Sequence, residues 1–331
     1  MLYDALLVVS FGGPEKTEDV IPFLENVLRG RNVPRERMLE VAEHYYHFGG
    51  RSPINDQNRE LVAALRKRLD LPVYWGNRNW HPMLADTLRQ MKKDRIRYAL
   101  AFATSAFSSY SGCRQYREDI AKAQAEIAAE TEEVPIIVHK LRTFSNHPLF
   151  IETMADRTAA AFERIPEERR AQAALVFTAH SVPVAMAQSS AYEPQLRDAA
   201  RLVAQRAGHV DWTLVFQSRS GPPAQPWLEP DIRDWLRGER PRDVVVVPLG
   251  FISDHMEVLY DLDTEAAQLC VELGINMVRA GTAGTHPKFL AMIDELIRER
   301  TYPGTPRRFE GTLGASPDDC PQTCCVGARR P

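Results

Sequence analysis

The sequence has no large excess of either charge and no long apolar run. Its 331 residues include 41 lysines and arginines and 44 aspartates and glutamates, giving a net charge of −3. This balance gives no reason to expect a nucleic acid as partner. No apolar stretch reaches the roughly 20 residues that cross a bilayer. The first residues, MLYDALLVVSFGG, lack a basic leader, which argues against a signal peptide. We therefore expect a cytoplasmic protein without stable membrane insertion.

Cysteine is scarce and unevenly placed. The chain has five cysteines. Two of them, Cys113 and Cys270, stand alone, and the other three, Cys320, Cys324 and Cys325, fall within six residues near the end. In a reducing cytoplasm such a cluster binds metal more often than it forms disulfides. Three thiolates need a fourth ligand to hold a [2Fe–2S] cluster, and either of the two distant cysteines could supply it. A zinc site or an idle tail is the alternative.

Short apolar runs, in contrast, alternate with helical patterns along most of the chain. Strands are expected at residues 6–9, 73–76, 98–103, 134–138, 173–178, 213–216, 244–249 and 275–278. Helices are expected between them, and residues 31–53 are expected to be rich in loops. Strand–helix alternation is the signature of parallel α/β sheets.

The alternation comes in two successive blocks. We expect two similar Rossmann-like halves, each a parallel sheet flanked by helices, with a central cleft. The first half is expected over residues 1–145 and the second over 146–300, with the last helix free to pack on the first half. Residues 301–331 lack apolar periodicity and read as a cysteine-rich tail, ordered, if at all, by its cysteines.

The stretch PLGFISDHMEVLYDLDTE, residues 248–265, carries the most informative pattern. It begins at the end of a predicted buried strand, breaks at Gly250, and continues as a helix that Ser253 or Asp254 could cap. Three acidic residues at four-residue spacing share one face of that helix: Glu257, Asp261 and Glu265. The alternative is a solvated acidic stripe. Open α/β sheets keep their sites at the carboxyl ends of strands, which favours a path for a metal cation.

His180 directly follows the predicted strand ALVFTA. A lone histidine there is often structural. Paired across the cleft with Glu257, however, it offers a nitrogen and an oxygen donor that suit a borderline divalent ion such as ferrous iron. A neutral imidazole can also accept a proton near pH 7. We expect protonation of His180 below about pH 6 to disable either role.

Other residues near the predicted strand ends could hold a ligand. Arginines bind carboxylates through two parallel hydrogen bonds, and aromatic rings can face a flat ligand. The candidates for carboxylates are Arg29, Arg31, Ser52 and Tyr116, and those for an aromatic ligand are Phe11 and Trp227. The alternative for the arginines is a solvated surface charge, that for Ser52 and Tyr116 is a surface hydrogen-bonding role, and that for Phe11 and Trp227 is a place in the core.

Seven stretches between Leu6 and Asp263 resemble the ferrochelatase family, within it the actinobacterial branch, and they occur in the family's order. They are LLVVSFGGPE, FGGRSPIN, GNRNW, FATSAFSSYSGCRQYRED, VFTAHSVP, QSRSGPPAQPWLEPD and PLGFISDHMEVLYDLD. The resemblance implies an enzyme of haem biosynthesis that inserts Fe²⁺ into a porphyrin and releases two protons. It also implies two Rossmann-like halves with the porphyrin between them.

The resemblance assigns roles to particular residues. His180 is similar to the family's active-site histidine and Glu257 to its carboxylate partner. The acidic line Glu257, Asp261 and Glu265 resembles that of a widened helix. Ser52 and Tyr116 match positions that bind porphyrin propionates. Phe11 stands where bacillus-type enzymes place a tyrosine near the metal.

The family's clustered enzymes use one internal cysteine, in a motif that YSGC matches, and three C-terminal ones. The resemblance therefore implies a [2Fe–2S] cluster on Cys113, Cys320, Cys324 and Cys325, with Cys270 as the odd thiol. The spacing of the last three differs from the vertebrate pattern.

Actinobacterial members of the family resemble coproporphyrin III enzymes. Four propionates favour a polar, basic pocket, for which Arg29, Arg31, His44 and Tyr45 are available. A protoporphyrin IX enzyme, a non-catalytic tetrapyrrole or metal carrier, and a chelatase inserting Co²⁺ or Ni²⁺ are the alternatives. The expected partners are the porphyrin and ferrous iron, and transient contact with other haem-pathway enzymes is left open.

Overall fold

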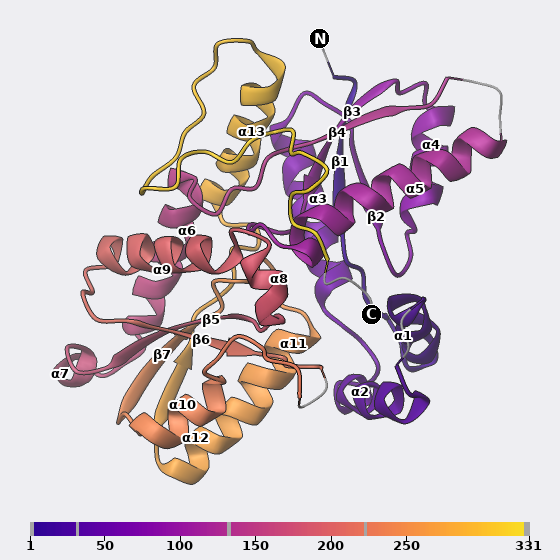
Figure 1. Ribbon diagram of the computed structural model, residues 1–331. Helices are drawn as coiled ribbons and strands as arrows, with labels where there is room; N and C mark the ends of the chain where they lie inside the picture. Colours follow the sequence, from indigo (N-terminus) through magenta and orange to yellow (C-terminus); the bar gives the residue numbers. More distant parts are fainter. Residues whose placement is uncertain (1–2, 31–32, 131–133, 222–223, 328–331) are drawn as a thin grey trace. The chain divides into compact units, whose positions relative to one another are not determined.

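A computed structural model describes residues 3–30, 33–130, 134–221 and 224–327 (Figure 1). The described residues divide into two compact units. The first takes the chain up to Thr104, Tyr116–Leu141 and Asp254–Met256. The second takes Ser105–Gln115, Arg142–Ser253 and the chain from Glu257 onward.

Each unit contains one four-stranded parallel sheet, and the two sheets have the same topology. The first sheet has the order β2-β1-β3-β4, made of β1 (Ala5–Ser10), β2 (Val73–Asn77), β3 (Tyr98–Ala103) and β4 (Ile137–Lys140). The second has the order β6-β5-β7-β8, made of β5 (Ala174–His180), β6 (Thr213–Gln217), β7 (Asp243–Val247) and β8 (Asn276–Arg279). The expected pair of helix-flanked parallel sheets is confirmed.

The strand order reverses direction once in each sheet, between β1 and β3 and between β5 and β7. At such a switch point the connections leave the two neighbouring strands toward opposite sides, so a crevice forms at their carboxyl ends. Loops that follow β1, β3, β5 and β7 are therefore the ones best placed to build a site.

Most strands differ from the predicted bounds by one to three residues, and for two of them the reason is local. The strand β7 ends at Val247, two residues before the prediction, because Pro248 has no amide hydrogen to donate. The strand β4 begins at Ile137, where its pairing with Tyr98 of β3 begins, and Val134 is exposed.

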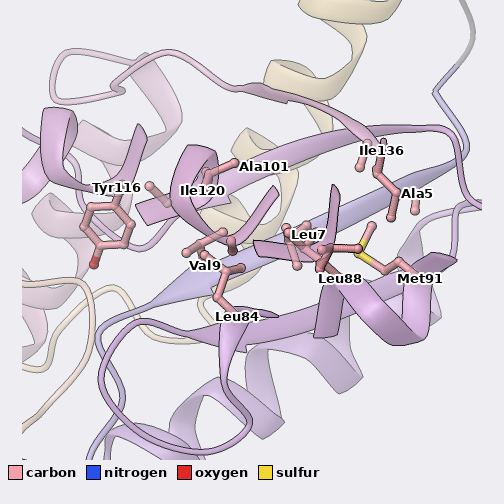
Figure 2. Close-up of a cluster of buried hydrophobic side chains, with 14 residues drawn as sticks. Ala5, Leu7, Val9, Leu84, Leu88, Met91, Ala101, Tyr116, Ile120 and Ile136 are labelled. Atoms are coloured by element: carbon pink, nitrogen blue, oxygen red, sulfur yellow. The ribbon is translucent and has the colours of Figure 1, made fainter. Parts of the chain in front are cut away.

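The described helices of the first unit are η1 (Thr17–Asp19), α1 (Val20–Leu28), α2 (Arg35–His47), α3 (Ile54–Arg68), α4 (Leu84–Lys93) and α5 (Gln115–Glu130). Alternate residues of β1 face α4 and α5. Figure 2 shows Leu7 and Val9 packed against Leu84 and Leu88, with Tyr116 at the far end of the cluster from Met91. The helix α3 packs against the edge strand β2.

The helix α2 was not expected, because residues 31–53 read as loop. Met38 and Ala42, four residues apart on α2, are buried against Phe23 and Leu24 of α1. The glycines that suggested a loop lie only at the end of the segment, where the backbone turns with positive φ at Gly49 and Gly50.

The described helices that lie wholly or mainly in the second unit are the π-helix η2 (Tyr110–Arg114), α6 (Pro148–Phe162), α7 (Glu167–Arg170), α8 (Val184–Gln188), α9 (Tyr192–Arg206), α10 (Ile232–Glu239), α11 (Met256–Val258), the π-helix η3 (Leu259–Ala266), α12 (Ala267–Leu273) and α13 (Pro287–Thr301). One face of the second sheet packs against α10, η3 and α12. The helices α6 and α9 contact β7, β5 and β6, and α13 packs on α6.

The described part of the tail, residues 302–327, has no helix or strand, but it is held by more than its cysteines, contrary to the prediction. The buried Arg142 side chain pairs with Glu299 at 2.7 Å and donates to the Arg308 carbonyl at 2.8 Å. Asn146 donates to the Gly314 carbonyl at 2.7 Å. These bonds tie the tail to the segment before α6.

Among the described helices, none is both long and apolar enough to cross a membrane.

Candidate active site

His180 is the last residue of β5, at the switch point of the second sheet. Strand residues two apart point to the same face, so His180 shares the face of Val176 and Thr178. That face packs against α10 and η3. The strand therefore aims the imidazole toward the acidic helix.

Gly250 brings the acidic segment close to the end of β5. Its amide donates to the Thr178 carbonyl at 2.9 Å, and a Cβ at this position would lie 2.7 Å from the Cα of Ala179. Only glycine allows this approach of the loop after β7. The loop then leads into α11, which carries Glu257.

The imidazole of His180 is held at both nitrogens. Nδ1 donates to the carbonyl of Ser181, and Nε2 lies 3.3 Å from Oε1 of Glu257. The hydroxyl of Tyr192 donates to the His180 carbonyl at 2.9 Å. Because the Ser181 carbonyl keeps the hydrogen on Nδ1, the Nε2 lone pair of the neutral ring faces the carboxylate and is free for a metal or a proton.

The partners of this pair do not come from opposite walls. His180 and Glu257 both belong to the second unit, so the expectation that they meet across the cleft between the two halves is wrong. The local reason is the loop after β7, which returns over the end of the neighbouring strand β5.

The acidic row lies along a widened helix, as the family resemblance implied. Asp261 and Glu265 are in the π-helix η3, whose i→i+5 bonding widens the turn. Each acid has a different polar partner. Glu257 faces His180, Asp261 accepts a hydrogen bond from Ser218, and Glu265 lies 3.1 Å from Arg233. Cationic neighbours at both ends thus offset the repulsion within the row.

These contacts set the protonation of the site. Burial lowers the pKa of His180, but the carboxylates of Glu257 and Asp261 and the Ser181 carbonyl outweigh burial and raise it to about 9. Burial raises the pKa of Asp261 to about 7, although the hydrogen bond from Ser218 acts in the opposite direction and lowers this pKa. At its pKa of about 9, the His180 imidazolium is the favoured form at neutral pH in the protein without iron or porphyrin, so protonation begins well above the pH of about 6 that the sequence predicts.

Sequence reasoning missed three residues that organise this row. Gln217, at the end of β6, donates to the Glu257 carbonyl at 2.7 Å. Ser218 follows it with a left-handed backbone, φ 63°. Arg233 on α10 pairs with Glu265. Burial lowers the pKa of Arg233, but the carboxylates of Asp231 and Glu265 outweigh burial and raise it above its usual value. The signal for the first two was their position at the carboxyl end of a buried strand, in the stretch QSRS.

The expected substrate-binding residues of the first unit fall in two groups. Phe11 and Tyr45 are half-buried and pack edge-on against Phe23, with ring centroids 6.2 and 5.7 Å away. Arg29 is exposed at the end of α1 and donates to Asn26 at 2.5 Å. Burial lowers the pKa of His44 on α2. Arg31 lies outside the described residues.

Ser52 and Tyr116 are more deeply placed than a free anchor would be. Ser52 is 3% exposed, and its Cβ would lie only 2.8 Å from a Cβ added at Gly13, so Gly13 packs closely against it. Tyr116 is 4% exposed and belongs to the cluster of Figure 2.

Trp227 belongs to the second unit and lies beside the segment that follows His180. It forms a bridge with Pro183, and the next residue, Leu228, donates its amide to the Val182 carbonyl at 3.0 Å. The ring is half-buried against Gly221. This pairing fixes the indole close to the end of β5.

Three of the five thiols meet in the second unit. Cys113, in the π-helix η2, hydrogen-bonds Cys325, whose sulfur lies 3.5 Å from that of Cys324. Arg114 donates to the carbonyl of Cys324 at 3.3 Å. Cys320 is half-buried four residues earlier. Within the described part of the chain, no three histidine, cysteine or acidic side chains already form a group that could hold a metal ion.

Cys270 lies elsewhere, buried in the cluster between the second sheet and α12, with its sulfur 3.7 Å from that of Met277. Burial raises the pKa of this thiol to about 11. It behaves as a small apolar side chain.

Two parallel sheets of identical order and a histidine–carboxylate pair at a switch point define a chelatase-type α/β protein. Solved structures agree on the fold. The sirohydrochlorin chelatase SirB from Bacillus subtilis subspecies spizizenii, in complex with cobalt, matches with a TM-score of 0.57 at 11% identity, over 93% of this chain and all of that one.

Sequence comparison narrows the class. The ferrochelatase family model matches residues 3–301. A ferrochelatase of Rhodopirellula baltica is 57% identical over 99% of this chain and 95% of the relative. The coproporphyrin III ferrochelatases of Nocardia farcinica and Streptomyces coelicolor are 50% and 52% identical, over 100% and 99% of this chain and 99% and 94% of the relatives. The chain belongs to the ferrochelatase family, which confirms the family and the enzyme class expected from its motifs.

Proposed function

We propose that the protein inserts Fe²⁺ into coproporphyrin III in haem biosynthesis, forming metal–nitrogen bonds. Relatives named coproporphyrin III ferrochelatase align with almost the whole chain and are identical to it at about half of the aligned positions. The observation that carries the proposal is the His180–Glu257 pair at the switch point of the second sheet, with the acidic row leading from it.

In this reaction two pyrrole N–H bonds are exchanged for bonds to iron, and two protons leave. Nε2 of His180 and the carboxylate of Glu257 supply the nitrogen and oxygen donors that suit ferrous iron. Iron arriving at this pair replaces the proton that Glu257 and Asp261 stabilise on the imidazole. Asp261, with a pKa of about 7, suits the transfer of protons at neutral pH, so the row can carry iron inward or protons outward.

The porphyrin is the proposed ligand of the remaining candidates. Phe11 and Trp227 would face the ring, and four polar residues would serve its propionates: Arg29, Tyr45, Ser52 and Tyr116. Because Ser52 and Tyr116 are nearly buried, we expect a small rearrangement of their surroundings when a propionate binds.

We further propose a resident [2Fe–2S] cluster. Thiolates are the usual ligands of such a cluster, and Cys325 lies within hydrogen-bond contact of both Cys113 and Cys324, none of which is in a disulfide. These three sulfurs would have to draw together to bind it, since they do not yet form a metal-binding group. Cys320, in the same tail, would be the fourth ligand. When bound, such a cluster supplies one-electron redox chemistry. Here the thiols would fasten the tail to η2. A cytoplasmic location and transient contacts with other haem-pathway enzymes are further predictions.

One anaerobic assay tests the proposed reaction. Purified protein is mixed with Fe²⁺ and coproporphyrin III, or with protoporphyrin IX, and the porphyrin absorption is followed. We expect coproporphyrin III to be consumed faster. Preference for protoporphyrin IX would replace the substrate, and binding without consumption would favour a carrier. Turnover only with Co²⁺ or Ni²⁺ would indicate another chelatase.

A further inference from the structure

Arg78 is a buried arginine that none of the roles above uses. It directly follows β2, in the stretch GNRNW, and its side chain is only 4% exposed. A buried guanidinium is costly unless its charge and its hydrogen bonds are satisfied.

The guanidinium is held on three sides within the first unit. Nε donates to the carboxylate of Asp119 on α5. The central guanidinium carbon of Arg78, Cζ, lies 4.6 Å from the ring centroid of Tyr116 and 5.8 Å from that of Phe11. Both rings are within the range of cation–π attraction. Among the described residues, Asp119 is the only hydrogen-bond partner of the side chain, so the two terminal nitrogens have none.

The backbone fixes this arrangement. The Arg78 amide donates to the Ser10 carbonyl at 3.0 Å, and the Asn79 amide donates to the Phe11 carbonyl at 3.1 Å. Gly12 has a φ of 83°, and a Cβ there would lie 2.8 Å from the Cβ of Asn77. The loops after β1 and β2 are thereby fastened together, so Phe11 and Arg78 keep their relative position without any ligand.

From this geometry we infer that Arg78 binds a propionate carboxylate of the porphyrin through its two terminal nitrogens. This inference rests on the proposed function and deepens it. Asp119 occupies one edge of the guanidinium and the rings of Phe11 and Tyr116 lie near its planar carbon, so the edge left over is the one that takes a carboxylate by two parallel hydrogen bonds. Both aromatic residues are themselves candidates for substrate binding, which places the free edge beside the ligand.

Arg78→Gln tests the inference, with Arg66→Gln as the matched control. Arg66 is in the same unit and donates through Nε and Nη2 to the Val73 carbonyl, at 3.1 and 2.8 Å, so the control removes an equal charge and a comparable pair of bonds. The dissociation constant of metal-free coproporphyrin III is measured by fluorescence. We expect it to rise about ten- to a hundredfold in Arg78→Gln and to stay unchanged in Arg66→Gln. Unchanged affinity in a folded Arg78→Gln protein overturns the inference.

Arg78→Lys covers the case in which the glutamine variant does not fold. Lysine keeps a charge for Asp119 but cannot form two parallel bonds. We expect weaker porphyrin binding, with KM for coproporphyrin III raised more than kcat is lowered. Wild-type affinity in this variant also refutes the role. Failure of the wild-type protein to insert iron would instead refute the proposed function. The comparison of porphyrin affinities does not depend on iron insertion, so it would still test the role of Arg78.

Discussion

The hydroxyl of Ser218 donates a hydrogen bond to the carboxylate of Asp261, and Ser218 does so from a left-handed backbone conformation with φ 63°. A non-glycine residue in that region is strained, and such strain persists where the surrounding structure requires it. Here the bond joins the end of β6 to the π-helix that carries the acidic row.

Ser218→Ala removes this bond, which now lowers the pKa of Asp261. The pKa should rise above about 7, so the row carries less negative charge at neutral pH. We expect KM for Fe²⁺ to rise severalfold with a smaller change in kcat, measured at saturating porphyrin. Ser218→Gly also loses the bond but relieves the backbone strain. Wild-type iron dependence in both variants would contradict the role given to the hydroxyl.

The protonation of His180 can be measured directly. With a pKa of about 9, its ring resonances should titrate above neutral pH in a histidine-labelled NMR sample without iron. Glu257→Gln removes the strongest stabiliser of the imidazolium, and burial then dominates, so the midpoint should fall by more than one pH unit. A midpoint near 6.5 in the wild-type protein would show that the carboxylates do not control this proton.

His180→Ala should lose about a hundredfold or more in the rate of iron insertion, the usual effect of removing an acid–base group. Porphyrin binding should remain, because the proposed anchors of the ring are other residues. The comparison is kcat by absorbance against the dissociation constant by fluorescence. Substantial turnover in this variant would remove His180 from the mechanism.

His147, the cap of α6, should make the protein sensitive to acid. Burial and the charges of Arg142 and Arg308 lower its pKa to about 3, against about 6.5 in an unfolded chain. Between these values the unfolded state binds a proton that the folded state does not, so stability falls as the pH drops from about 6.5 toward 3.

In His147→Asn the cap can be kept, because asparagine also accepts an amide hydrogen at this position, while the titrating group is gone. The thermal midpoint, followed by circular dichroism from pH 7 to 4.5, should decline less steeply than in the wild-type protein. Parallel declines would show that other groups govern acid unfolding.

Cys324→Ser should abolish the visible absorption of the proposed [2Fe–2S] cluster in protein purified without oxygen. Cys270→Ala is the control, since this thiol is buried among apolar side chains, and its spectrum should match that of the wild-type protein. Retention of the bands in Cys324→Ser would exclude this cysteine as a ligand.

Much of the molecule follows from local patterns in the sequence. Continuous apolar runs such as Val244–Val247 are typical of strands buried on both faces, and the alternation with helices predicts parallel sheets. Spacing placed Glu257, Asp261 and Glu265 on one helical face, and position placed His180 at a strand end. Such properties depend on residues that are close in the chain, so pattern alone reaches them.

Other features depend on contacts between distant segments, which no local pattern encodes. Gly250 passes over the end of β5, and this puts Glu257 in the same unit as His180. The pKa of His180 depends on carboxylates about 80 residues away in the chain, and the helix α2 forms because α1 covers its apolar face. Only the folded chain sets the distances between these segments. Those distances decide which charge a side chain carries, how deeply it is buried and which residue it pairs with.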